Sequence, residues 1–561
     1  MNTEDNNNAS HPAESRSELP VHSRAPSPAE ANGDTPKDRR TLNDQDILRR
    51  NTVISTLGSV GKASAPLYLA LTTKLYGIEL FGIFATAQVF AELAMSMVTA
   101  GFNDAALMSA AQRNQPPPTD EARLADGTTF ADDLSAENAR GAEKMNKHHD
   151  DQNARDTHAL ATSIFWIVAL CISILLPAAF LSPRILPRLY EWGDTLAKLL
   201  QIMAVGVPLF GLSRLFVATT IGHQDFRYDA AVNGIARPAG LLIFATSFYF
   251  LFGGVEALAL AWVGAQALAF AVSLHGFLKY ESPKALIKTL RVHGLDPSVL
   301  AFAVPQSLSV TFQRFAAGMG VIMLGVFGYS SIITGVYAAC VQVIDNAVNT
   351  VRFIFTNVFN PWVPRLTARN ERPRLAELLT SLQLQSAWAC TGVILALLLF
   401  EPEVLGLFVP DYTADPTVFA ALLLSPWLLA SIGLVGSVIV LTGRSRLNLF
   451  NAIAASALNA TLNALLIPPY GALGAALGTG ISTALLCVLQ TIESKRLEQV
   501  APNWNRLAPA LLAMLGATSA LVLARHALPL ALPLRVTTAV IVAASAALFL
   551  RRGAAPLPTP P

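Results

Sequence analysis

Long apolar stretches recur along almost the whole chain, and they constrain its fold more than any other feature. About 20 consecutive apolar residues span the hydrocarbon core of a bilayer as one helix. Charged residues make up only 14% of the 561 residues, whereas soluble domains carry about 25%. The sequence therefore predicts an all-α integral membrane protein with about fourteen transmembrane helices, at residues 52–73, 81–104, 159–181, 196–221, 229–252, 255–278, 298–326, 331–358, 376–400, 415–442, 446–467, 471–492, 507–525 and 533–550.

The placement of Lys and Arg in the loops predicts the orientation, because cytoplasmic loops carry an excess of these residues. With the N-terminus inside, cations gather on the inner side, for example at 49–50, 284–291 and 551–552, whereas the outer loop 401–415 has none. An even number of helices then places both termini in the cytoplasm. Residues 1–48 are polar and lack the apolar region of a signal peptide, which predicts a disordered cytoplasmic tail.

Two similar segments indicate an internal duplication. Gly82-Ile83-Phe84-Ala85 matches Gly335-Val336-Tyr337-Ala338 at an offset of 253 residues, and Gly222-His223 matches Gly443-Arg444 at an offset of 221. The drop of 32 residues between the two offsets is about what the charged cytoplasmic loop at 113–157, which looks disordered, adds to the first half. We therefore expect two parallel six-helix bundles, at 49–280 and 281–495, related by a pseudo-two-fold axis along the membrane normal. Residues 505–552 would add two C-terminal helices.

Four ionisable residues fall near the middle of predicted helices, where a charge costs roughly 2.5–3.5 kcal/mol on insertion scales. They are Lys62 and Glu92 in the first repeat, and Arg314 and Asp345 in the second. One interpretation is a structural ion pair within each repeat, in which Glu92 and Asp345 hold the cations. The other is a central hydrated cavity, in which a cation meets an anionic substrate and an acid couples to an ion or a proton.

Three further arginines lie deeper in the helices than loop residues do. Arg214, Arg237 and Arg352 are each about two turns from the predicted cytoplasmic ends. Each alone is compatible with a side chain that reaches back to the interface. Together they indicate a basic inner vestibule that suits a phosphate-bearing headgroup, because guanidinium can hold phosphate oxygens in pairs.

Signals for an enzyme, a metal or a cofactor are not found in the sequence. It contains no Walker A, HExxH or GxSxG motif, and Cys171, Cys340, Cys390 and Cys487 lie singly inside apolar segments. We expect no catalytic residue, no metal site, no cofactor and no nucleic-acid partner.

Several short motifs resemble those of polysaccharide flippases in the multidrug/oligosaccharidyl-lipid/polysaccharide (MOP) exporter superfamily. The segment Leu458–Ala476 (LNATLNALLIPPYGALGAA) is similar to helices eleven and twelve of these flippases, and Leu441–Arg444 (LTGR) to the turn after helix ten. Tyr76–Phe84 (YGIELFGIF) and Gly335–Ala339 (GVYAA) resemble the starts of helices two and eight. The likeness covers roughly residues 50–495. Fourteen helices also resemble the lipid II flippase branch.

The resemblance implies a flippase that moves undecaprenyl-linked oligosaccharide across the bacterial inner membrane by alternating access. Its partners would be the pyrophosphate-linked saccharide, membrane lipid, and the polymerase and glycosyltransferases of surface polysaccharides such as lipopolysaccharide or exopolysaccharide. Many members carry Asp in helix seven where this chain has about Gly320, so ion coupling through that acid is not carried over. The substrate-binding candidates are Lys62, Arg214, Arg237, Arg314 and Arg352, with Glu92 and Asp345 as ion-coupling or pairing acids.

Two alternatives remain at this point. The first is an antiporter of multidrug or other cations, similar to the MATE transporters of the same superfamily. Its cavity would be rich in acids, whereas five intramembrane cations face two clear acids here. The second is a membrane glycosyltransferase or ligase, which the short outer loops and the missing catalytic motif disfavour.

Overall fold

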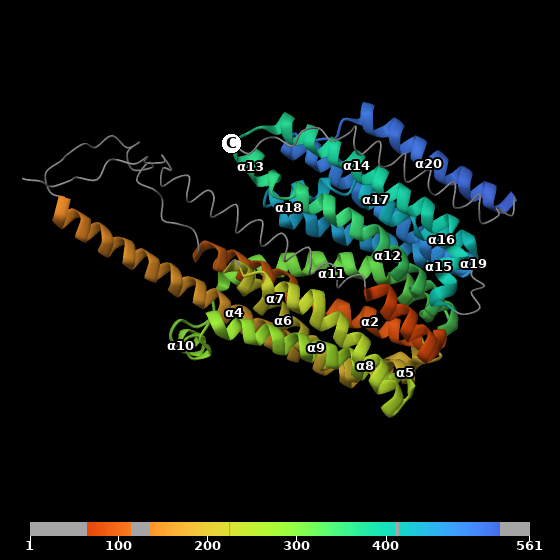
Figure 1. Cartoon of the computed structure of the whole chain (residues 1–561), viewed down its shortest axis with the longest axis horizontal. Coiled ribbons are helices and arrows are strands. Elements are labelled where there is room, and N and C mark those ends of the chain that lie inside the picture. The colour runs from red at the N-terminus through yellow and green to blue at the C-terminus, as the bar shows by residue number, and fades with distance from the viewer. Residues whose placement is uncertain (1–63, 114–133, 224, 410–414, 528–561) are drawn as a thin grey trace, which may run out of the picture. The chain divides into compact units, whose positions relative to one another are not determined.

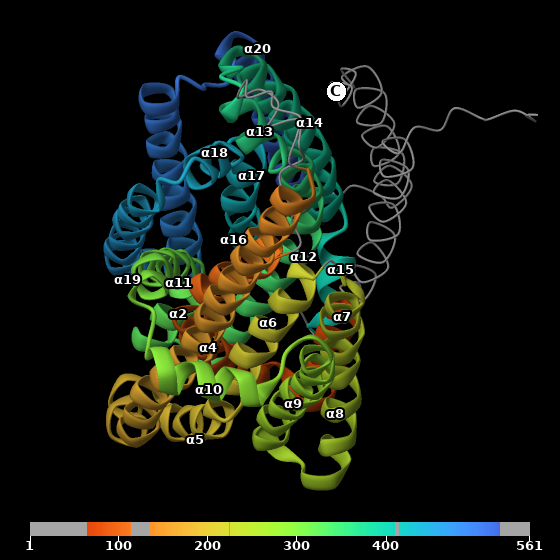
Figure 2. The same ribbon diagram turned by 90° about the vertical axis from the view of Figure 1, so that its left-hand side faces the viewer.

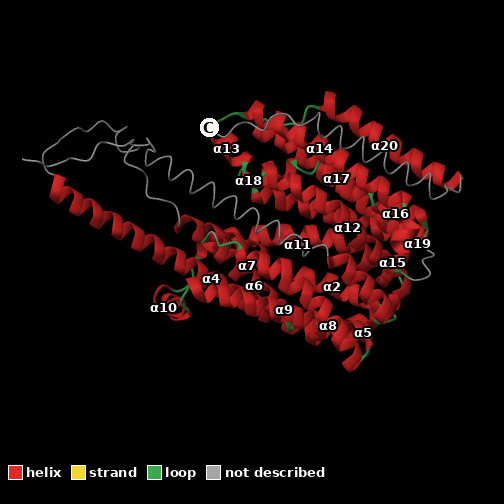
Figure 3. Ribbon diagram, in the orientation of Figure 1, coloured by secondary structure: helices red, strands yellow, loops and turns green. Residues whose placement is uncertain are grey.

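The computed structural model describes residues 64–113, 134–223, 225–409 and 415–527. Every regular element in these ranges is a helix (Figure 3). The expected tail at 1–48, Lys62 and the expected last helix at 533–550 lie outside them. The first half contains α2 (Ser64–Arg113), α4 (Leu134–Leu189), α5 (Gly193–Ala204), α6 (Gly206–Gly222), α7 (Arg227–Asp229), the π-helix η2 (Ala230–Ala236), α8 (Arg237–Phe252), α9 (Gly254–Tyr280) and α10 (Pro283–His293).

The second half is also helical throughout its described part, and several of its membrane helices are built from short consecutive pieces. It contains α11 (Pro297–Val326), α12 (Ser331–Phe359), α13 (Trp362–Ala368), α14 (Arg372–Leu399), α15 (Glu401–Phe408), α16 (Pro416–Leu422), α17 (Leu424–Ser431), α18 (Val435–Leu441), α19 (Ser445–Glu493), η3 (Ser494–Glu498) and α20 (Trp504–Ala527).

Ten helices in the described ranges are long and apolar enough to cross a membrane, or eleven if the bent pair Pro416–Ser431 and Val435–Leu441 forms one span. This makes the chain a multi-pass membrane protein, although the expected count of fourteen is not confirmed. Two of the spans contain a non-helical glycine, Gly77 in α2 and Gly471 in α19. At Gly471 the chain reverses direction, as contacts between the residues on either side of it show. A Cβ on Gly474 would meet Leu466, and a Cβ on Gly478 would meet Asn463. The long α19 is therefore a hairpin of two antiparallel helices.

The helix α4 begins well before its apolar stretch. Its first residue, Leu134, lies inside the segment 113–157 that was expected to be a disordered loop. The added part contains four Ala and six Glu, Lys and Arg residues, which favour helix by intrinsic propensity, together with three Asn and three Asp, which favour it less. Hydrophobicity alone therefore placed the start of the membrane span and missed the polar helix that precedes it.

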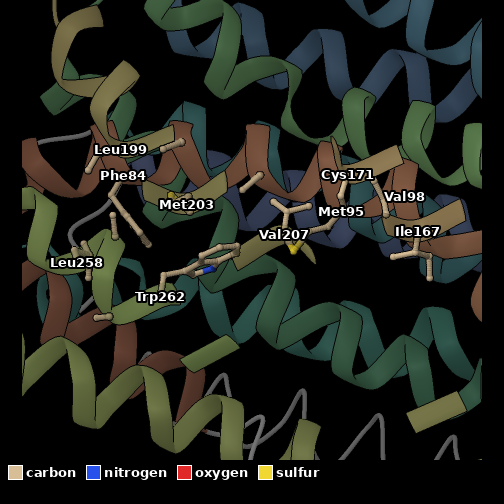
Figure 4. Close-up of a cluster of buried hydrophobic side chains, with 14 of the residues drawn as sticks. Phe84, Met95, Val98, Ile167, Cys171, Leu199, Met203, Val207, Leu258 and Trp262 are labelled. Carbon is tan, nitrogen blue, oxygen red and sulfur yellow. The ribbon is translucent and has the colours of Figure 1, made fainter. Parts of the chain in front are cut away.

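Two large apolar cores hold the helices together. The first includes Phe84, Met203 and Trp262 (Figure 4), and it also takes in Val299 and Ala303 from α11. The second lies among α12, α14, α17 and α19, and it takes in side chains of α2, such as Phe81. The helices α2 and α11 thus contribute to both cores, and they run side by side (Figure 1). Within the first core, α8 and α9 form another close pair (Figure 2).

Candidate functional site

The pairing of α2 with α11 positions the first part of the site. Small and polar residues of the two helices meet in antiparallel register: a Cβ on Gly318 would touch Val89, Ser96 donates to Thr311 at 3.3 Å, and the Gly101 amide donates to Ser307 at 3.0 Å. Small side chains let the two backbones approach closely, as is common between membrane helices. Because the two helices pack closely in this register, one charged residue of α2 and one of α11 lie side by side at the same height along the helix axes.

Glu92 on α2 and Arg314 on α11 meet in this interface. The carboxylate Oε2 lies 3.8 Å from the guanidinium Nη1, and both side chains keep substantial exposure, 38% and 61%. Gln88, one turn before Glu92, donates to its other carboxylate oxygen at 3.0 Å. One interpretation of the sequence was a pair between Glu92 and Lys62 within one repeat, and Lys62 lies outside the described residues. Among the described residues Glu92 pairs with Arg314, a cation of the other repeat.

A second pair of charges stands on α12. Asn349 donates to Asp345 at 3.0 Å and accepts from the Nε of Arg352 at 3.1 Å, so one amide connects the two charged groups. The charges of Arg314, Arg352 and Glu92 all act on Asp345. Asp345 and the three charged groups within its electrostatic range therefore belong to α2, α11 and α12, and they balance as two cations and two anions. We call Glu92, Arg314, Asp345 and Arg352 the central charge cluster.

One reciprocal contact between α2 and α12 has the spacing of the expected internal repeat. A Cβ on Gly82 would lie 2.0 Å from the carbonyl oxygen of Ser331, and a Cβ on Gly335 would lie 2.3 Å from that of Ile78. Each residue of α2 in this contact has its counterpart in α12 at the offset of 253, which is the offset of the repeat. Glu92 and Asp345 each follow by 14 residues (78 to 92 and 331 to 345), so this contact sets the two acids at matching levels.

A separate polar group lies inside the first half, around Arg237. Its Nη1 donates to Asn233 at 2.6 Å, its Nε donates to Gln266 at 3.1 Å, and its guanidinium lies 4.7 Å from the centre of the Phe210 ring. Its Nη2 is buried and has no hydrogen-bond partner among the described residues. Asn233 belongs to the π-helix η2, which ends next to Arg237; such short π-helical insertions are frequent at functional sites.

Arg214 on α6 belongs to the same region, because its charge acts on Arg237. Its side chain is exposed, and it has no hydrogen bond or ion pair within the described part of the chain. The one acid that acts on Arg237 is Asp229, and Asn233 donates to it at 2.7 Å. We call Arg214, Arg237 and Asp229 the first-half basic group. It has one more cation than anions.

The structure thus divides the candidates from the sequence. Arg314 and Arg352 join Glu92 and Asp345, and Arg214 joins Arg237. Sequence analysis missed the amides that connect the charges, namely Gln88, Asn233 and Asn349. Each lies one helical turn, three or four residues, from a charged residue in an apolar run, and this spacing was available as a signal.

The position of Gly320 has no room for an acid. A Cβ there would lie 2.4 Å from the hydroxyl of Tyr337, which is buried. Tyr337 also hydrogen-bonds with Thr479 on α19. The space beside Gly320 is therefore filled by a tyrosine of α12. Among the described residues no three His, Cys, Asp or Glu side chains gather as a metal site.

Comparison with solved structures identifies the fold. A structure described as the lipid II flippase MurJ in an inward closed conformation matches with a TM-score of 0.64 and 12% identity, over 89% of this chain and 98% of that chain. A structure of the MATE multidrug transporter DinF-BH matches with a TM-score of 0.56 and 18% identity, over 85% of this chain and 99% of that chain. An inward-facing MATE transporter of the MOP superfamily matches at 0.55 and 13%, over 82% and 98%.

At these identities the likeness establishes the fold, which is the one shared by MurJ and the MATE transporters. The fold expected from the sequence resemblance is thereby confirmed. No model of a known protein family matches the sequence, and no curated protein matches it.

Proposed function

We propose that this protein is a transporter that moves an undecaprenyl-linked oligosaccharide from the inner to the outer leaflet of the bacterial inner membrane, for the assembly of surface polysaccharide. The observation that carries the proposal is the meeting of charged side chains from both halves near the middle of long apolar helices. Charged groups in such places are expensive and usually line a hydrated path or hold a substrate.

The cations of that path suit a phosphate-linked substrate. Lys62, Arg214, Arg237, Arg314 and Arg352 would engage the pyrophosphate and acidic sugars at successive stages of transport. Arg314 pairs with Glu92, and Arg352 is connected to Asp345 through the amide of Asn349, so a substrate would have to replace those contacts. Glu92 and Asp345 would then be released, which gives a physical link between substrate binding and a change of the helix arrangement.

A route across the membrane follows from the contacts of α2. At the end near Gly82 it packs against α12, and at the end near Gly101 it packs against α11. Alternating access requires these two contacts to open in turn. In the predicted orientation the Gly82 end of α2 faces outward and both termini are cytoplasmic. The glycosyltransferases and the polymerase would act before and after the flip.

One observation favours a second candidate, a multidrug or cation antiporter: the multidrug transporter DinF-BH shares the fold. The charges argue against it here. Four arginines and three acids make up the two charged groups described above, and a surplus of positive charge repels a cationic substrate. A membrane glycosyltransferase or ligase is supported by no catalytic arrangement among the described residues.

The decisive experiment is reconstitution of the purified protein in liposomes. We expect a fluorescent undecaprenyl-diphosphate-linked oligosaccharide to exchange between leaflets at least about tenfold faster than in protein-free liposomes, measured by its accessibility to an impermeant quencher. A permanently cationic dye, tested in parallel under a proton or sodium gradient, should not be transported. Transport of the dye without exchange of the lipid would establish the antiporter instead.

A further inference from the structure

The short helix α10 joins the two halves of the protein at the membrane surface. The span formed by α9 ends at Tyr280, α10 runs from Pro283 to His293, and the next span begins at Val299. Because so few residues separate α10 from the span on each side, both of its ends stay at the level where the spans leave the membrane. Figure 1 shows α9 lengthwise and α10 end-on, so α10 runs across the direction of the spans and lies along the membrane surface.

One side of α10 is fastened to α4, against which it packs. Just beyond the end of α10, the Nε2 of His158 donates to the carbonyl oxygen of Gly294 at 2.9 Å, and the amide of Asp296 donates to the hydroxyl of Thr162 at 3.1 Å. His158 and Thr162 belong to the first turns of the α4 span Thr157–Leu189. These contacts hold the end of α10 at the level where α4 enters the membrane.

The opposite face of α10 carries its charge. Lys284, Lys288 and Arg291 are spaced by four and three residues, so they form one stripe along the helix, and all three are exposed. With about 3.6 residues per turn, this stripe points away from the buried Leu286 and the half-buried Leu290, which pack into the first core. The helix sequence contains no acid, and none of the three cations has an ion pair in the described part of the chain. We call Lys284, Lys288 and Arg291 the basic stripe. Its charge is not balanced by these parts of the protein.

Apolar side chains flank the basic stripe on both sides. Ile287 and Val292 are 56% and 65% exposed, and with the three cations they line a shallow hollow on the surface of α10. Such a face is typical of helices that lie in the plane of a bilayer, because the apolar side chains enter the boundary of the acyl chains while the cations meet anionic headgroups. An acidic protein would match the charges as well. The position of α10 between two spans, however, places the stripe next to the headgroups of the bilayer itself.

We propose that α10 binds anionic phospholipid of the leaflet at which it lies, with the basic stripe on the headgroups and with Ile287 and Val292 on the acyl chains. The ligand is a lipid of the surrounding membrane and not a transported substrate, so the inference goes beyond the proposed function and does not depend on it. Because α10 is the covalent connection between the two halves, the bound headgroups hold this connection at the membrane surface while the halves move.

Lipid contact at α10 can be measured on the full-length protein in nanodiscs. A fluorophore is attached to the variant Ile287→Cys, since the four native cysteines are buried. The discs contain equal amounts of phosphatidylcholine and phosphatidylglycerol, and one of the two is brominated near the headgroup end of its acyl chains so that it quenches a nearby fluorophore. We expect brominated phosphatidylglycerol to quench at least about twofold more strongly than brominated phosphatidylcholine, because the basic stripe enriches the anionic lipid.

Replacing the cations shows whether the stripe causes this preference. The two lipids should quench equally when the stripe is neutralised by Lys284→Gln, Lys288→Gln and Arg291→Gln. The matched control neutralises three exposed cations of the second half, by Arg365→Gln, Arg369→Gln and Lys495→Gln, and should keep the preference.

Equal quenching by the two lipids in the protein with its native stripe would overturn the proposal. An unchanged preference without the stripe, or the same loss of preference in the control, would overturn it as well. A fluorophore that neither lipid quenches would place α10 away from the bilayer and would favour a soluble acidic partner instead. None of these measurements uses transport, so their outcome is separate from that of the flippase assay.

Discussion

Reversing the charge of Arg314 should nearly abolish transport without preventing expression. In the Arg314→Glu variant three acids would face one cation, Arg352. The acid nearest to position 314 is Glu92, whose Oε2 lies 3.8 Å from the Nη1 of Arg314 in the wild type. Two like charges about 4 Å apart repel by about 1 kcal/mol in water and about 4 kcal/mol at an effective dielectric constant of about 20. Since both side chains are partly exposed, we expect about 2 kcal/mol, or roughly a thirtyfold loss of lipid exchange in proteoliposomes.

Exchanging both charges distinguishes a connecting role of this pair from direct binding of substrate. The double variant Glu92→Arg with Arg314→Glu restores opposite charges at the same positions. If the pair joins α2 to α11, we expect exchange to return to at least about a third of the wild-type rate. Persistent inactivity of a stably folded double variant would show instead that Arg314 must itself meet the substrate. Arg184→Glu, at an exposed cation of α4, controls for a general effect of charge reversal.

The class of fold could be predicted from the sequence because membrane insertion depends on properties of each segment that can be read along the chain. Length and apolarity of a segment decide whether it spans, and these can be counted from residues alone. The repeat was also detectable, and the offset between Gly82 and Gly335 appears in the structure as a reciprocal contact. What a linear pattern could not supply is which helix faces which. The contact of Glu92 with Arg314 of the other repeat, for example, was not anticipated.

The charged residues could be located from the sequence for a similar reason. Their division into two groups could not be predicted in this way. A charge in an apolar run is conspicuous, so Arg237 and Asp345 were recognised from their positions. Their environments depend on tertiary contacts: Gln266 reaches Arg237 from a helix 29 residues away in sequence. The number of acids around each cation, which decides whether it is free to bind an anion, follows only from such contacts.

Adding one methyl group at Gly82 should disable the transporter by preventing closure at that end of α2. A Cβ there would lie 2.0 Å from the Ser331 carbonyl and 2.9 Å from the Cα of Gly335, so the two helix backbones must move apart. Backbone atoms cannot turn away as a flexible side chain can. We expect Gly82→Ala and Gly335→Ala each to lower lipid exchange at least about tenfold by shifting the population toward the state open at this end.

The accompanying change in conformation can be measured directly at the contact. Ser331 is buried there, with 6% exposure, and Ser331→Cys is a nearly isosteric reporter whose reaction with an impermeant maleimide should be slow. Adding Gly82→Ala should accelerate that reaction at least about tenfold. Gly406→Ala is the matched control, since a Cβ on this helical glycine of α15 meets nothing within 4 Å. If Gly82→Ala retained both wild-type exchange and slow labelling, the α2–α12 contact would not be a gate. The repeat would then have preserved this glycine pair for close packing alone.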